Sequence, residues 1–147
     1  MLRRPLIAIL LAVAGSAHAA GPPPAKAAGA SAAGQYVDIQ PVGLPIVVDG
    51  RLVNYVFVHV RLNLTAGANT TKWREKEPFF RDALVRAGHR TPFTRPDDYQ
   101  KIDTARLTEA LMREALAIAG QGVVRSAVVT SEASRYRVPT PRTASRS

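Results

Sequence analysis

The sequence predicts an α+β domain in which a small antiparallel or mixed sheet, built on a long β-hairpin, is covered on one face by two helices. Three observations predict this fold. An Asp-Gly pair separates two β-branched runs, the second of these runs alternates strictly, and two segments of helical period follow before a last β-branched run. Strands followed by helices and a returning strand are typical of α+β proteins.

The predicted hairpin spans residues 45–64, with Asp49 and Gly50 at the turn. Both residue types tolerate the positive φ that tight hairpin turns require. A side-chain period of two sends the alternating sets of the second arm to opposite faces. The aliphatic set is Val56, Val58, Val60, Leu62 and Leu64, and the mixed set is Tyr55, Phe57, His59, Arg61 and Asn63. We expect helices to cover the aliphatic set and leave Tyr55, Phe57, His59 and Arg61 as a candidate assembly face.

The N-terminal residues have the features of a signal peptide over residues 1–19. Arg3 and Arg4 precede a short apolar run, and small residues at 17 and 19 favour cleavage before residue 20. The apolar run is shorter than the roughly 20 residues that a spanning helix needs, which favours a cleaved signal peptide. An uncleaved inner-membrane anchor is the alternative. Residues 20–35 are rich in Pro, Ala and Gly, which predicts a disordered linker. We therefore expect a periplasmic or secreted protein.

A single domain is predicted over residues 36–133. Its first segment, residues 36–40, alternates and predicts an edge strand or an extended lead-in. Pro41, Gly43 and Pro45 interrupt the segment, and a central strand does not tolerate prolines at such positions.

Residues 71–87 predict the first helix, with Thr71 as its N-cap and Gly88 as its C-terminal stop. Pro78 lies either in the first turn of a helix that begins near residue 77 or at a kink in a longer helix. The side chains that follow helical spacing are Trp73, Glu77, Phe80, Leu84 and Ala87. Aromatic residues at this spacing indicate a core position more often than a ligand platform.

A loop over residues 89–102 leads to the second helix, residues 104–119, which Asp103 caps. The apolar stripe of this helix consists of Leu107, Leu111, Ala115 and Ile118, flanked by Ala110. Gly120 and Gly122 end the helix, and residues 123–131 predict the last strand. Residues 134–147 contain four arginines and no acidic residue, which predicts a disordered basic tail.

No group of residues in the chain predicts catalysis. The chain has no cysteine, which excludes disulfides and thiolate chemistry. His59 and His89 have no second ligand at metal-binding spacing, and no nucleophile-elbow motif occurs. We expect no enzyme, no metal and no cofactor. A hydrolase with a hidden site stays open, and it needs a pocket that holds His59 or His89 beside a carboxylate.

Positive charge is the main compositional feature. Beyond residue 19 the chain has 18 basic and 11 acidic residues, and the surplus gathers in residues 72–95 and 125–147. Such clusters favour anionic partners, which in an exported protein are lipid, wall polymer or acidic proteins rather than nucleic acid. A solvated helix face is the plainer interpretation. The candidate contacts with an anionic surface are Lys72, Trp73, Arg74, Lys76, Arg86, Arg90, Arg135 and Arg137.

The order of these segments resembles the periplasmic domain of the flagellar basal-body-associated FliL family. The resemblance covers residues 36–131, and Glu77-Pro78 followed by Arg81-Asp82-Ala83 is its most specific part. It implies a fold similar to the stomatin/SPFH domain, no catalysis, self-association into rings, and contact with the stator units of the flagellar motor. Members of the family usually keep a membrane-spanning N-terminal helix.

Together these observations predict a non-enzymatic scaffold or adaptor at the flagellar basal body or motor. Its expected partners are envelope or motor proteins and further copies of itself. The alternative is a cationic module that binds anionic lipid or wall polymer of the cell envelope.

Overall fold

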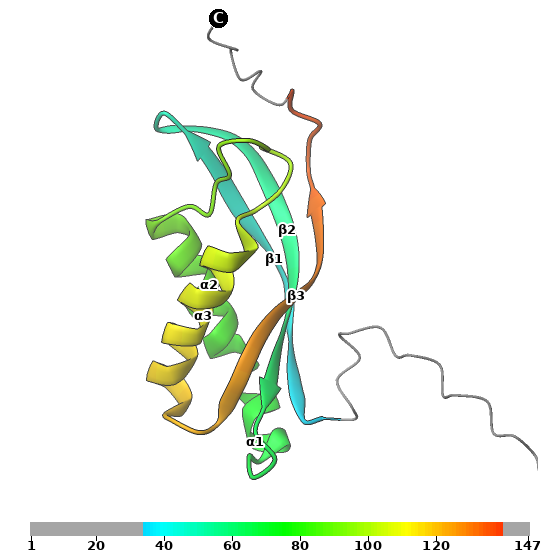
Figure 1. Ribbon diagram of the computed structural model, residues 1–147, viewed down its shortest axis with the longest axis vertical. Coiled ribbons are helices and arrows are strands. Elements are labelled where there is room, and N and C mark those ends of the chain that lie inside the picture. Colours follow the sequence, from blue (N-terminus) through cyan, green and yellow to red (C-terminus); the bar gives the residue numbers. More distant parts are fainter. Residues whose placement is uncertain (1–33, 140–147) are drawn as a thin grey trace, which may run out of the picture. The chain divides into compact units, whose positions relative to one another are not determined.

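Three antiparallel strands form one sheet with the order β1-β2-β3, and the helices pack on one side of it (Figure 1). This computed structural model describes residues 34–139. The elements in chain order are β1 (Tyr36–Val48), β2 (Arg51–Leu64), α1 (Thr70–Glu75), α2 (Glu77–Arg90), α3 (Thr104–Ala119) and β3 (Val124–Ser134). The predicted α+β class, with helices covering one face of a hairpin-based sheet, is confirmed.

The hairpin turn forms where the sequence predicts it. Asp49 has φ 49° and Gly50 has φ 73°, and Val48 pairs with Arg51 across the turn. Two consecutive positive φ angles are the signature of a type I′ turn, whose twist matches that of the flanking strands. The Asp-Gly pair therefore sets the register of β1 against β2.

The predicted first strand is too short, because β1 runs without a break through Pro41, Gly43 and Pro45. Two conditions allow this. The strand pairs only with β2, so a proline can direct its missing N–H away from the ladder. A register shift between Ile39 and Val42 also takes Pro41 out of regular pairing.

The core lies between the sheet and the helices. All five aliphatic side chains of the predicted set on β2 are at most 3% exposed, and they meet apolar side chains from β1, α2 and α3. The largest fully buried members include Phe80, Leu84, Leu107 and Leu111. The two-sided pattern predicted for β2 and the helical core positions are thus confirmed.

The predicted helix over residues 71–87 is two helices. Lys76 separates α1 from α2, and Pro78 lies in the first turn of α2, as in the first of the two predicted alternatives. Asn69, not Thr71, caps α1, because its Oδ1 accepts a hydrogen bond from the backbone N–H of Lys72 at 3.0 Å.

Gly88 does not end α2, which continues to Arg90. A Cβ at Gly88 would lie 2.7 Å from Cδ2 of Leu44 on β1. The glycine therefore permits close packing of the helix on the sheet, and the sequence signal for a C-terminal stop is wrong at this position.

The helix α3 has the bounds that the sequence predicts. Asp103 caps it by accepting a hydrogen bond from the backbone N–H of Arg106 at 3.0 Å, and Gly120 ends it with φ 80°. No helix within residues 34–139 has the length and hydrophobicity to cross a membrane. The predicted signal peptide and most of the predicted linker lie outside the described residues.

The last strand is longer than predicted, because β3 ends at Ser134 and pairing with β2 continues beyond it. The backbone N–H of Arg135 donates to the carbonyl of Tyr55 at 2.9 Å. The first residues of the predicted disordered tail are therefore attached to the sheet, and residues 140–147 of that tail lie outside the described part.

Candidate interaction surfaces

The face of the sheet that points away from the helices carries the predicted assembly residues. Side chains of Tyr55, Phe57, His59 and Arg61 lie on this face of β2, and Phe57 is 42% exposed. Val128 of β3 pairs with Arg61 and is 45% exposed. We call these five residues the open sheet face. Strand alternation places the four β2 side chains on one face, as the sequence predicts, and pairing of β3 with β2 adds Val128.

Phe57 occupies the middle of the open sheet face because its neighbour on β1 is a glycine. Gly43 pairs with Phe57, and a Cβ at Gly43 would lie only 3.1 Å from Cε1 of the ring. The ring can therefore lie against the β1 backbone. This arrangement leaves an exposed aromatic surface at the centre of the sheet.

Arg61 is fixed at the β1 side of the open sheet face. Its Nε and Nη2 donate to the two carboxylate oxygens of Asp38 at 2.7 and 3.1 Å, and its guanidinium lies 3.9 Å from the ring centroid of Tyr36. The hydrogen bonds to Asp38 raise the pKa of Arg61. Both side chains are substantially exposed, so the pair orients the guanidinium more than it stabilises the fold.

The structure does not bring the predicted basic contacts together. Lys72, Arg74 and Lys76 lie on or directly after α1, near the end of β2, whereas Arg135 follows β3 and bonds to Tyr55 near the start of β2. Because β2 is a single 14-residue strand, these two basic groups lie at opposite ends of the sheet. The two groups therefore do not form a single basic patch.

Many of the intervening arginines are engaged by acidic neighbours. Among the described residues, ion pairs join Arg61 to Asp38, Arg81 to Glu77, Arg86 to Asp82, Arg95 to Asp97 and Arg113 to Glu109. The hydrogen bond from Arg95 holds the pKa of Asp97 below its usual value. Arg86, a predicted surface contact, thus has part of its charge balanced locally, and Arg90 lies exposed at the C-terminal end of α2.

Around α1 the cations lie over aromatic rings. The Nζ of Lys72 is 5.0 Å from the Trp73 ring, the guanidinium of Arg74 is 5.6 Å from the Tyr36 ring, and Nζ of Lys76 is 5.0 Å from the Phe79 ring. Trp73 itself is 9% exposed and packs 6.2 Å from Phe80 between ring centroids. The prediction of Trp73 as a surface contact is therefore corrected, because its ring belongs to the core.

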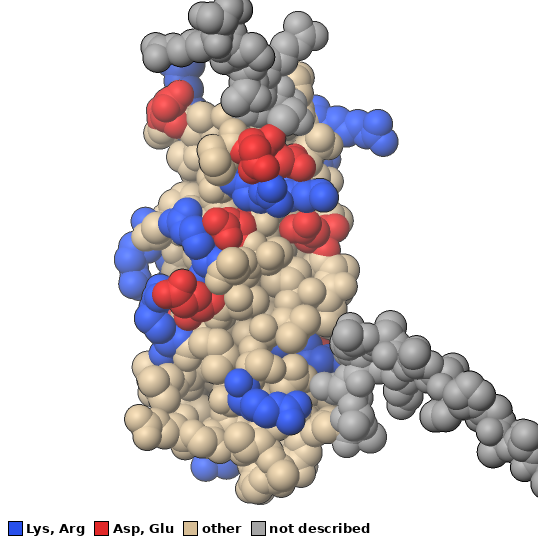
Figure 2. Space-filling model, in the orientation of Figure 1, with Lys and Arg blue, Asp and Glu red and all other residues tan. Residues whose placement is uncertain are grey.

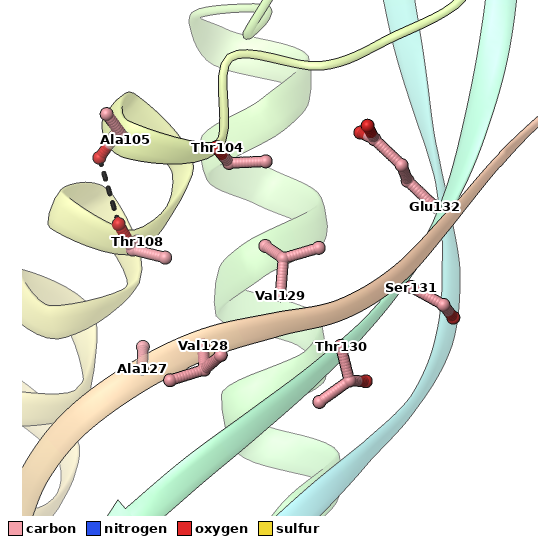
Figure 3. Close-up of a pocket in the computed structure, with 9 residues that line it drawn as sticks. All are labelled: Thr104, Ala105, Thr108, Ala127, Val128, Val129, Thr130, Ser131 and Glu132. Carbon is pink, nitrogen blue, oxygen red and sulfur yellow. Dashed lines mark hydrogen bonds between the residues drawn. The ribbon is translucent and has the colours of Figure 1, made fainter. Parts of the chain in front are cut away.

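A groove of about 490 Å³ lies between α3 and β3 (Figure 3). Thr104 and Thr108 of α3 face Ala127 and Val129 of β3 across it. Two of its polar groups have partners, since the Thr108 hydroxyl donates to the Ala105 carbonyl at 3.0 Å and Glu132 accepts from the Ile102 N–H at 3.3 Å. Neither His59 nor His89 lines this groove.

Potential metal ligands do not gather within residues 34–139, where no group of three histidine, aspartate or glutamate side chains could hold an ion. His89 contacts the carbonyl of Val85 through Nδ1 at 2.9 Å. His59 lies exposed on the open sheet face. The two histidines that the sequence analysis singled out are therefore on different elements, β2 and α2.

Sequence reasoning missed Asn54, which is 1% exposed at the start of the aliphatic face of β2. Its side-chain amide bonds to the backbone of Tyr99 in the loop before α3 and to Ser134 and Tyr136 at the end of β3. The alternation of β2 carries the signal, since position 54 precedes Val56 by two residues. A polar residue that shares the two-residue period of the buried side chains indicates a buried polar group that has hydrogen-bond partners.

The fold and these surfaces define an α+β domain with a helical cover on one face of its sheet and an exposed aromatic side chain, Phe57, on the other. Comparison of the chain with protein-family models and with curated proteins finds no match. The resemblance to the FliL family thus stays an interpretation of the local sequence patterns.

Proposed function

We propose that this chain is a non-enzymatic, exported adaptor of the cell envelope that contacts a protein partner through the open sheet face. The single observation that supports it is the exposure of Phe57 on the central strand β2 and of Val128 on the edge strand β3, on a sheet face that the described helices leave uncovered. Exposed apolar groups gathered on one face, with charged groups at their border, are typical of protein contact sites.

The edge of the sheet supports the same proposal. β3 has 11 residues, contains no proline and pairs on one side only within the described residues. Edge strands of this kind are templates for pairing with a further chain, and natural proteins usually block them. A partner on the open sheet face can therefore extend its contacts onto the β3 edge.

The flagellar part of the proposal rests on the resemblance to the FliL family. It makes the basal body or motor the place of action, with stator proteins or further copies of the chain as partners. The N-terminal signal features support export to the periplasm. Retention of the N-terminal segment as an inner-membrane anchor would leave the same face available to such partners.

Replacement of the chromosomal gene tests both parts in the host bacterium. We expect deletion to reduce swimming in soft agar, and Phe57→Glu to reproduce the deletion while the protein is still present at its normal level. Leu52→Glu is the matched control, because Leu52 is 54% exposed on the same strand but lies beside the hairpin turn. Normal swimming of the deletion strain refutes the flagellar role, and equal effects of the two substitutions refute the role of the open sheet face.

A further inference from the structure

We propose that the α1 end of the domain is a second contact surface, which binds a membrane that contains anionic phospholipids. We define the α1 end as Lys72, Arg74, Lys76 and Phe79. This proposal does not depend on the open sheet face, since none of its residues belongs to that face and its partner is a lipid surface rather than a protein.

The α1 end has a surplus of positive charge, because residues 72–76 hold three cations and one acid, the exposed Glu75. Lys72, Arg74 and Lys76 occur within five residues, and none forms an ion pair with a described residue, in contrast to five arginines elsewhere in the domain. Glu77, the acid at the start of α2, accepts the backbone N–H of Gln40 at 2.9 Å and lies 3.8 Å from Arg81. The three cations are therefore available for external phosphate groups.

Aromatic rings hold these cations in place before any ligand binds. Each of the three lies 5.0–5.6 Å from a ring centroid, and Nε of Arg74 also donates to the carbonyl of Tyr36 at 3.4 Å. A ring occupies one side of each cation and restricts the movement of its side chain. Less side-chain freedom is then lost when a phosphate binds.

Phe79 favours a bilayer over a soluble polyanion. Its side chain is 55% exposed beside Lys76 and does not belong to the buried core cluster of the described residues. Aromatic and basic side chains that share one exposed surface suit the headgroup region, because the ring enters the apolar boundary while the cations meet phosphates.

The position of this surface also fits a membrane. The chain enters the domain here, where the Leu64 N–H donates to the carbonyl of Gln35 at 2.8 Å just before β1. On the face drawn in Figure 2, acidic side chains gather away from the region of α1 that Figure 1 labels in the same orientation.

Vesicle sedimentation of the full chain, in the form recovered from its host, tests the proposal. Vesicles of phosphatidylglycerol and phosphatidylcholine are compared with vesicles of phosphatidylcholine alone, so that any binding through the N-terminal apolar run cancels. We expect the affinity ratio to fall about a hundredfold in Lys72→Gln/Arg74→Gln/Lys76→Gln, because each cation near an anionic surface contributes roughly fivefold. Raising the salt concentration should remove the preference.

Two matched controls separate this surface from net charge and from general hydrophobicity. Arg51→Gln/Arg135→Gln/Arg137→Gln removes the same charge at the opposite end and should change the ratio less than about threefold. Phe79→Ala should weaken binding several-fold, whereas Leu52→Ala, with the same exposure, should not. Circular dichroism verifies that each variant is folded.

Three results overturn the proposal. They are equal binding of the wild-type chain to neutral and anionic vesicles, equal losses in the two triple variants, and binding to soluble polyphosphate as tight as to vesicles with no effect of Phe79→Ala. The last result would assign the α1 end to polyanions in general. None of these outcomes bears on swimming of the Phe57→Glu strain, so the two proposals fail separately.

Discussion

Replacing Asn54 with alanine tests how the sheet is held together at the end far from α1. The Nδ2 of Asn54 lies 3.0 Å from each of the carbonyl oxygens of Tyr99 and Tyr136, and 2.8 Å from the Ser134 hydroxyl. Its Oδ1 accepts the Tyr136 N–H at 3.1 Å. Because the amide has two N–H donors and one carbonyl, about three bonds to other segments exist at a time.

Each such bond contributes about 1 kcal/mol net, so Asn54→Ala should lower the free energy of unfolding by about 3 kcal/mol. For a domain of this size that loss is a large part of the roughly 5–15 kcal/mol expected in total, and it lowers Tm by roughly 10–20 °C. Ser134→Ala removes one acceptor of the Asn54 amide and the hydroxyl donor to the Tyr136 carbonyl, and should cost about 1–2 kcal/mol. Urea denaturation followed by circular dichroism measures both values.

Hydrogen exchange identifies the segment that is released. We expect the amides of Arg135 and Tyr136 to lose protection in Asn54→Ala, while those in the middle of β2 change only with global stability. A change in unfolding free energy below about 0.5 kcal/mol, the usual range for surface positions, would refute the reasoning. Unaltered protection of Arg135 and Tyr136 would refute it equally.

Asn54→Asp should make the free energy of unfolding depend on pH, and the buried surroundings of the side chain determine the sign of this dependence. Burial beside the carbonyls of Tyr99 and Tyr136 disfavours the charged form, so the pKa of the introduced carboxyl is raised in the folded state. The variant is therefore most stable below the ordinary aspartate pKa of about 3.9, and its stability falls relative to wild type as pH rises through the folded pKa. A parallel pH profile for the two proteins would contradict this assignment.

Three further predictions test other parts of the fold. Asp103→Ala removes the N-cap of α3 and should cost about 1 kcal/mol by urea denaturation, and no loss would contradict the capping geometry. Arg95→Gln should raise the pKa of Asp97 toward its ordinary value, because the hydrogen bond from Arg95 lowers it, and carboxyl NMR titration measures this change. The ion pair stabilises the fold above the pKa of the unfolded carboxyl, and this stabilisation is lost as the pH falls through the pKa of the folded one. Gly88→Ala should destabilise by about 1–3 kcal/mol, although alanine favours helices, because its Cβ meets the buried Leu44; a gain in stability would show that α2 can shift.

The parts of the fold that follow from local pattern were predictable. The alternation of Val56, Val58 and Val60 and the Asp-Gly turn depend only on a period of two and on allowed φ angles, and the structure confirms both. The bounds of α3 follow from an aspartate cap and a terminal glycine, and they are also confirmed. Each of these signals lies within a few residues of what it specifies.

The misses depend on contacts between distant segments. Gly88 reads as a helix stop, yet its role is set by Leu44, which is 44 positions away in the chain. Asn54 gains its partners from the loop before α3 and from the end of β3, which no local pattern places beside β2. The predicted basic contacts also divide in space, because the pairing of β3 with β2 carries Arg135 to the end of β2 far from α1.

The length of β2 sets the reach of the molecule. A strand of 14 residues is roughly 45 Å long, and cationic side chains lie near both of its ends. Lys72 and Arg137 can therefore engage two separate structures at the same moment, with the intervening β-ribbon as a spacer. The length of the strand would then fix the distance between the two bound structures.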